Sequence, residues 1–179
     1  MKIPWAGAIV AIFSFAVMAQ DTSTPKIDQG SNKMMRSPDT AFAMKAAQGG
    51  MAEVEAGKLA AEQASSPDVK AFGQQMVDDH GKANEQLKSV AEKQNLTLPT
   101  SMNAKQQAMY DMLKTKTGAD FDKAYVTAMV KDHTEDVKEF KKEADKGKDE
   151  QIKGFASETL PIIQGHLEKI KAIHSKMGG

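Results

Sequence analysis

The sequence predicts an all-α protein that folds as a four-helix bundle. Four long segments carry apolar residues three and four positions apart, which is the pattern of amphipathic helices. Alanine, lysine, glutamate, glutamine and methionine are abundant and aromatic residues make up only 6% of the chain, a composition that favours helix. No stretch alternates apolar and polar residues in the manner of a strand.

The N-terminus has the pattern of a secretory signal peptide. An apolar run from Ala6 to Met18 follows Lys2, and cleavage is expected after Ala19. The run is shorter than the roughly 20 residues that span a bilayer, so no stable membrane span is expected after signal removal. These features predict a protein of the periplasm or the extracellular space. Residues 20–38 are polar and predict a disordered linker, and residues 39–177 form the bundle.

The first two long helices are expected over residues 39–64 and 67–94. Asp39 is a candidate N-cap for the first, and Ser66 followed by Pro67 gives the second an N-cap and a proline at its first position. The third helix is expected over residues 119–146, ending at Gly147, and the fourth over residues 148–177. Pro161 lies inside the fourth helix, where its missing N–H predicts a kink.

A short connector helix is predicted over residues 104–114, between the second and third long helices. Leu98-Pro99 ends the preceding helix, and Gly118 separates the connector from the next one. The connection is long enough for an up-and-down loop or for a crossover of the ferritin-like kind, and we favour the ferritin-like arrangement.

Composition excludes several classes of function. The chain has 24 basic and 24 acidic residues, so nothing indicates a nucleic-acid partner. It has no cysteine and therefore no disulfide or thiolate ligand. Phosphate-binding glycine loops and nucleophile-elbow motifs are missing. The pattern identifies no protein partner.

Three of the four histidines point to a single site. His80, His133 and His166 each lie on the apolar stripe near the middle of a different helix, at depths that differ by only about 6 Å. The first helix offers Glu53 and Glu55 at a comparable level. We favour Glu55, because apolar residues flank it on the same face.

Two interpretations of this constellation remain open. The histidines and Glu55 could bind a transition metal ion, with zinc, copper and iron the candidates by ligand type, and with Asp79, Asp132 and Tyr125 as outer partners. The same side chains could instead form a structural polar network. The Glu-x-x-His motif of diiron oxidases is missing, and whether the protein is an enzyme stays open.

Several motifs resemble the DUF4142 family of exported bacterial proteins. The sequence Met-Val-x-Asp-His occurs at residues 76–80 and again at 129–133, and residues 50–60, 66–72 and 160–167 also match the family pattern. The resemblance implies a ferritin-like bundle and supports treating the histidines, Glu55, Asp79 and Asp132 as one constellation. It implies no activity. The leading hypothesis is an exported soluble bundle that binds a transition metal and acts in envelope stress or metal handling; the alternative is a non-catalytic structural or interaction domain.

Overall fold

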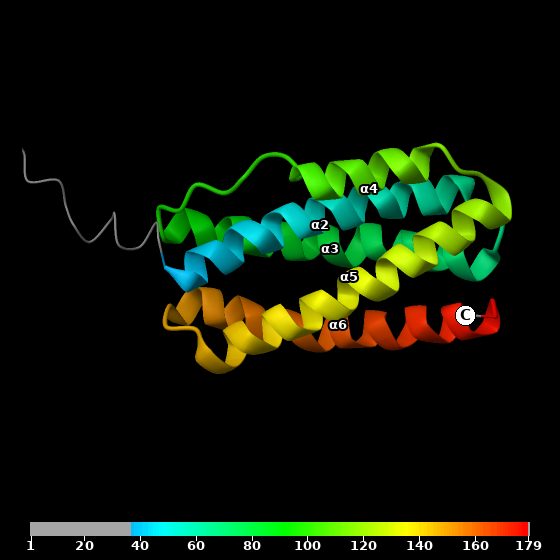
Figure 1. Cartoon of the computed structure of the whole chain (residues 1–179). Helices are drawn as coiled ribbons and strands as arrows, with labels where there is room; N and C mark the ends of the chain where they lie inside the picture. The colour runs from blue at the N-terminus through cyan, green and yellow to red at the C-terminus, as the bar shows by residue number, and fades with distance from the viewer. Residues whose placement is uncertain (1–36, 179) are drawn as a thin grey trace, which may run out of the picture.

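The computed structural model describes residues 37–178, and within that range the chain forms five α-helices and no β-strand (Figure 1). The helices are α2 (Pro38–Gln63), α3 (Pro67–Lys93), α4 (Ala104–Lys114), α5 (Gly118–Lys146) and α6 (Glu150–Lys176). The predicted helices are thus confirmed to within two residues at each end. The predicted signal peptide and most of the predicted linker lie outside the described residues. Pro38, predicted to end the linker, already belongs to α2.

The four long helices form two antiparallel hairpins, α2 with α3 and α5 with α6. The short helix α4 carries the chain back along the bundle, so α3 and α5 run in the same direction (Figure 1). α3 packs beside α6 and α2 beside α5, which closes the bundle. This is the crossover arrangement with a short connector helix that the sequence predicts.

Two buried aspartates, one at each end of the bundle, bind backbone N–H groups of a turn between two helices. The Asp122 carboxylate accepts hydrogen bonds from the backbone N–H groups of Ser65 and Ser66, at 3.0 and 2.8 Å, at the start of α3. At the other end, Asp39 accepts from the N–H groups of Lys148 and Asp149 in the turn before α6. The predicted role of Asp39 as N-cap is therefore wrong.

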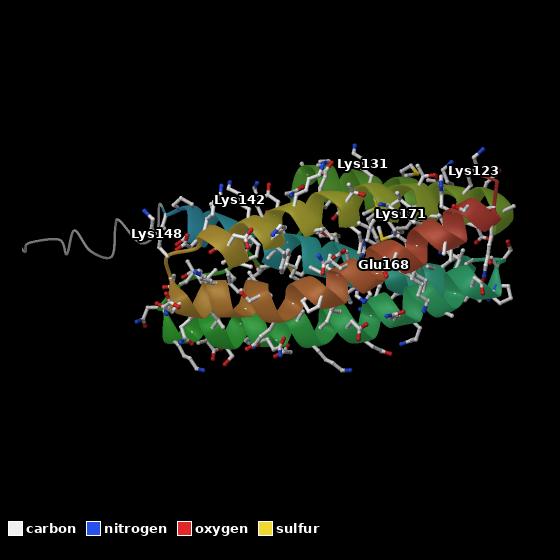
Figure 2. All side chains as sticks on the ribbon, turned by 90° about the horizontal axis from the view of Figure 1, so that it is seen from below. Lys123, Lys131, Lys142, Lys148, Glu168 and Lys171 are labelled. Atoms are coloured by element: carbon white, nitrogen blue, oxygen red, sulfur yellow. The ribbon has the colours of Figure 1, made fainter. Side chains whose placement is uncertain are left out.

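Ser37 is the N-cap of α2, since its hydroxyl accepts from the Thr40 N–H at 3.0 Å. α6 continues as helix through Pro161. Charged side chains cover the outside of the bundle: Lys123, Lys131 and Lys142 project from α5 in Figure 2. Among residues 37–178, no helix is both long and apolar enough to cross a membrane.

The apolar core consists of two separate clusters. One contains Phe72, Phe121 and Ile170, toward the α2–α3 turn. The other contains Phe42 and Phe140, with others, toward the α5–α6 turn. On each long helix a buried polar residue lies between the two clusters. The core is therefore divided by a polar layer, and this layer holds the candidate site.

Candidate metal centre

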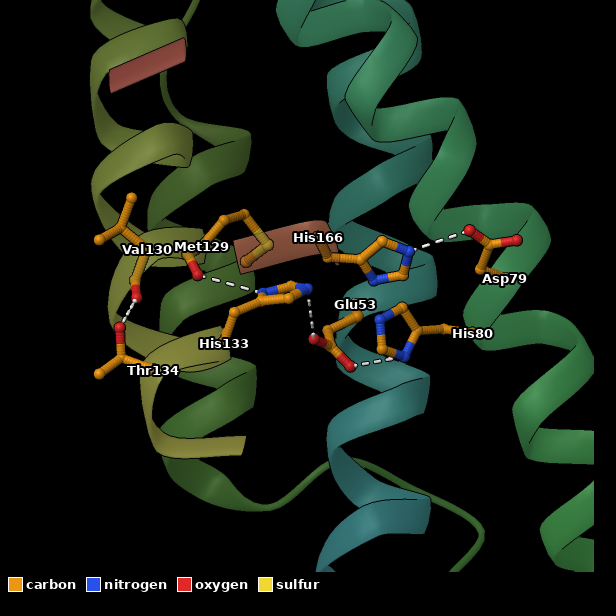
Figure 3. A network of polar contacts seen from close by, with 8 residues as sticks. All are labelled: Glu53, Asp79, His80, Met129, Val130, His133, Thr134 and His166. Atoms are coloured by element: carbon orange, nitrogen blue, oxygen red, sulfur yellow. Dashed lines mark hydrogen bonds and ion pairs between the residues drawn. The ribbon is translucent and has the colours of Figure 1, made fainter. Parts of the chain in front are cut away.

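Each long helix contributes one side chain to the polar layer. Glu53 comes from α2, His80 from α3, His133 from α5 and His166 from α6 (Figure 3). Their exposed fractions are 2%, 5%, 0% and 1%, so solvent reaches none of them appreciably. The imidazole ring centroids are 5.3 to 5.7 Å apart. The three histidines predicted from the sequence thus meet at one level of the bundle.

One nitrogen of each imidazole is held by an outer partner. His80 Nδ1 lies 2.9 Å from Glu53 Oε2, and His166 Nε2 lies 2.9 Å from Asp79 Oδ2. His133 Nδ1 lies 3.1 Å from the backbone carbonyl oxygen of Met129, one turn earlier on α5. A carbonyl or carboxylate oxygen accepts, so these nitrogens donate. These partners fix the orientation and the tautomer of all three rings.

The other nitrogen of each imidazole has no hydrogen-bond partner. These atoms are His80 Nε2, His133 Nε2 and His166 Nδ1, and all three are buried. Figure 3 shows them pointing into the space between the rings. Since the outer nitrogens carry the protons, the inner nitrogens present lone pairs to that space. Three lone pairs without a donor are costly, at about 1 to 3 kcal/mol for each unsatisfied group.

Burial keeps these imidazoles neutral at pH 7. It lowers the pKa of His133 to about 3, with a smaller contribution from the neighbouring imidazoles of His80 and His166. Burial likewise lowers the pKa of His80 and of His166. Neutral imidazole is the form that binds metal ions, so at pH 7 the three rings are in the protonation state that a metal site requires.

The donor set suits a transition metal ion. One ligand atom from each histidine lies within 4.8 Å of the other two. In a tetrahedral zinc site, nitrogen ligands about 2.1 Å from the ion are about 3.4 Å apart, a separation of the same order as the one found here. Three imidazoles are compatible with zinc, copper and iron.

The carboxylate of the layer is Glu53, and the expectation that Glu55 lies there is wrong. The Glu55 side chain is 41% exposed and forms an ion pair with Lys58 at 2.7 Å. Two residues along a helix correspond to about 200° of rotation, so Glu53 and Glu55 face opposite sides. Glu53 Oε1 has no hydrogen-bond partner and lies 3.5 Å from His133 Nε2. Burial, then the charge of Asp132, raises the pKa of Glu53 well above its usual range.

The three predicted outer partners, Asp79, Asp132 and Tyr125, have different positions relative to the histidines. Asp79 lies at the site, although it bonds to His166 and not to the neighbouring His80. Asp132 forms no hydrogen bond with a histidine among the described residues; one of its oxygens lies within 4.8 Å of oxygens of Glu53 and Asp136. Tyr125 lies in the adjacent apolar cluster with its hydroxyl unpartnered, and burial, then the charge of Glu53, raises its pKa.

Sequence reasoning missed two participants. Asp136 lies one turn after Asp132 on α5, and this spacing was a usable signal. The Met129 carbonyl gave no signal, because a backbone acceptor is independent of residue type. Glu53, which was passed over in favour of Glu55, also had a usable signal in the sequence. It continues a series of small buried α2 residues at intervals of three, Ala47, Gly50 and Ala56.

Comparisons with known proteins concern the whole fold. A DUF305 protein from Streptomyces coelicolor has a similar crystal structure, with a TM-score of 0.69 at 13% identity, covering 81% of this chain and 95% of that one. A DUF305 fragment from Deinococcus radiodurans gives a TM-score of 0.68 at 10% identity, with 78% and 96% covered. At such identities the likeness concerns the fold alone, and it confirms the predicted ferritin-like four-helix bundle.

No curated protein matches the sequence. The family model for DUF4142, described as a domain of unknown function, matches residues 24–173. That range includes all four helices of the bundle up to the last turn of α6 and every residue of the polar layer. The chain belongs to the DUF4142 family, as its paired Met-Val-x-Asp-His motifs predict.

Proposed function

We propose that this protein is an exported metal-handling protein that binds one transition metal ion through His80 Nε2, His133 Nε2 and His166 Nδ1. The observation that carries the proposal is the convergence of three buried, unpartnered imidazole nitrogens whose opposite nitrogens are all held by acceptors. A purely structural network would use its polar atoms on one another. Here the three inner imidazole nitrogens all accept, and a single metal ion can satisfy all three, whereas a proton on Glu53 could reach only His133.

Glu53 is the best-placed fourth group. Its Oε2 orients His80 while its free Oε1 faces His133, so a small rotation of the carboxylate would bring it toward the centre of the three rings. An ion held there is a Lewis acid, and copper or iron would also be redox-active. The layer is closed from solvent, and this favours storage or buffering of the ion, in metal handling or envelope stress, over turnover of a substrate.

The test is elemental analysis of the mature chain, from Gln20 onward, purified without a histidine tag. His80→Ala/His133→Ala is the variant, and His174→Ala is the matched control because His174 is the one histidine outside the layer. We expect about one equivalent of metal in the wild type and the control, and none in the double variant. Circular dichroism checks that each variant is helical.

A second measurement does not depend on any variant. Wild-type protein stripped with a chelator is reconstituted with zinc, copper or iron and unfolded by heat. A ligand present at 100 times its Kd adds about 2.7 kcal/mol to the free energy of unfolding, which raises the Tm by several degrees. No stoichiometric metal and no Tm shift with any of the three ions would leave the structural polar network as the function of the layer.

A further inference from the structure

A second group of ligands adjoins the histidines on the side of α5. One carboxylate oxygen each from Glu53, Asp132 and Asp136 lies within 4.8 Å of the other two. Asp132 and Asp136 are one turn apart on α5, and Glu53 meets them from α2. Within residues 37–178, neither aspartate forms an ion pair with a lysine or a histidine. Three carboxylates are thus gathered without a cationic side chain among them.

Glu53, the most buried member of this group, has a carboxylate oxygen without a hydrogen-bond donor. Glu53 is 2% exposed, and its Oε1 has no hydrogen-bond donor. His80 Nδ1 holds the other oxygen, Oε2, at 2.9 Å, while Oε1 lies 3.5 Å from His133 Nε2, and the Asp136 carboxyl is within hydrogen-bonding reach of Glu53. An ionised aspartate can only accept, so Asp132 and Asp136 supply a donor to Oε1 only while one of them carries a proton. Once all three carboxyls are ionised, the group lacks a positive partner, and burial makes that lack costly.

A groove leads from solvent to the two aspartates. Its volume is about 520 Å³, and residues of α2, α4 and α5 line it, Asp132 and Asp136 among them. Four lysines also line it: Lys45, Lys105, Lys131 and Lys138. Lys105 pairs with Glu135 at 3.5 Å and Lys45 with Glu139 at 3.6 Å, while the charges of Lys105 and Lys131 also act on Asp132 without forming an ion pair with it among the described residues. The groove therefore gives a hydrated ion access to the carboxylates and room for the water ligands that three side chains leave open.

We propose that Glu53, Asp132 and Asp136 form a second cation site, for a hard divalent ion of the manganese, magnesium or calcium class. Three carboxylates with water from the groove match the all-oxygen coordination of such ions, whereas the imidazoles suit softer transition metals. The proposal goes beyond the histidine site and does not require that site to be loaded. Glu53 belongs to both groups, since its Oε2 holds His80, so the two sites share one residue.

Manganese is the probe, because its electron paramagnetic resonance signal distinguishes free from bound Mn²⁺. The full mature chain, stripped of metal and then saturated with zinc, is titrated with Mn²⁺. Asp132→Asn/Asp136→Asn is the test variant. The matched control is Asp120→Asn/Asp145→Asn, which neutralises two exposed carboxylates of the same helix that do not line the groove.

We expect one Mn²⁺ equivalent in the wild type and the control, and an affinity lowered more than about tenfold in the test variant. Replacing crowded carboxylates by amides removes repulsion, so this variant should fold. No Mn²⁺ or Ca²⁺ binding to the wild type, or equal binding to wild type and test variant, would overturn the second site. Zinc content reports the histidine site separately: it should persist in Asp132→Asn/Asp136→Asn and vanish in His80→Ala/His133→Ala, whose Mn²⁺ site should remain.

Discussion

Acid should destabilise the metal-free protein through His133. This side chain is fully buried, and burial lowers its pKa to about 3, against about 6.5 for an unfolded histidine. Below pH 6.5 this histidine is protonated in the unfolded chain but stays neutral in the folded protein. The stability associated with neutral His133 is therefore complete above pH 6.5 and is lost as the pH falls toward 3.

The magnitude follows from the difference between the two pKa values. Each pH unit below 6.5 lowers the free energy of unfolding by about 1.4 kcal/mol for one such histidine, so lowering the pH from 7.5 to 5 costs about 2 kcal/mol. The buried carboxylates act in the opposite direction. Burial raises the pKa of Glu53, Asp132 and Asp136, so their contribution is greatest at low pH and is lost as the pH rises through those values. The wild-type profile is the sum of both.

A variant isolates the histidine. His133→Gln cannot titrate, so the wild-type stability minus that of the variant should fall by about 2 kcal/mol between pH 7.5 and pH 5. Urea unfolding followed by circular dichroism at 222 nm, in the presence of a chelator, measures each value. His174→Gln, outside the polar layer, controls for the loss of one histidine and should follow the wild type. A difference that stays constant over this range would refute the conclusion that a buried, neutral His133 supports the layer.

Three further results are expected. Glu53→Gln should weaken zinc binding about 10- to 100-fold by calorimetry, because it alters the group that orients His80, whereas Glu55→Gln should bind like the wild type. Asp122→Ala should cost about 1 to 3 kcal/mol in urea unfolding, since it leaves N–H groups at the start of α3 unpaired. Gly73→Ala should lower the Tm, at a cost of about 1 to 3 kcal/mol in the free energy of unfolding, because the new Cβ would lie 2.6 Å from an alanine Cβ of α2. As a control, the new Cβ of Gly154→Ala meets nothing within 4 Å, so this variant should stabilise α6 by about 0.5 to 1 kcal/mol.

Most of the fold was predictable because its signals are local. The stripe of each helix, Pro67 after Ser66, and Leu98-Pro99 all act within a few residues of the chain. The role of Asp39 was not local. Ser37 and Asp39 are both good N-cap residues, and the choice between them depends on the turn before α6, more than 100 positions away, whose N–H groups occupy the Asp39 carboxylate.

The histidines were predictable for a similar reason, and the carboxylate was not. A histidine at the midpoint of an apolar stripe points inward whatever the rotation of its neighbours. Glu53 and Glu55 both have apolar neighbours, so the choice between them depends on which face of α2 is buried. Small residues form that face, and they allow α2 and α3 to approach closely. At Gly57 and Gly73, a Cβ atom added to either glycine would lie 2.7 Å from the carbonyl oxygen of the other. Close approach of α2 and α3 turns Glu53 inward.

The division of the core bears on why such a layer exists. Apolar clusters lie on both sides of Glu53 and the three histidines, so four apolar side chains of similar volume would join them into one continuous core. Exchanging buried polar groups for well-packed apolar ones is often neutral or stabilising by about 1 to 4 kcal/mol. The polar layer thus contributes less to stability than apolar side chains would, and its unpartnered nitrogens lower that contribution further. The proposed cation would remove that deficit, because it would satisfy the same three lone pairs that weaken the metal-free bundle.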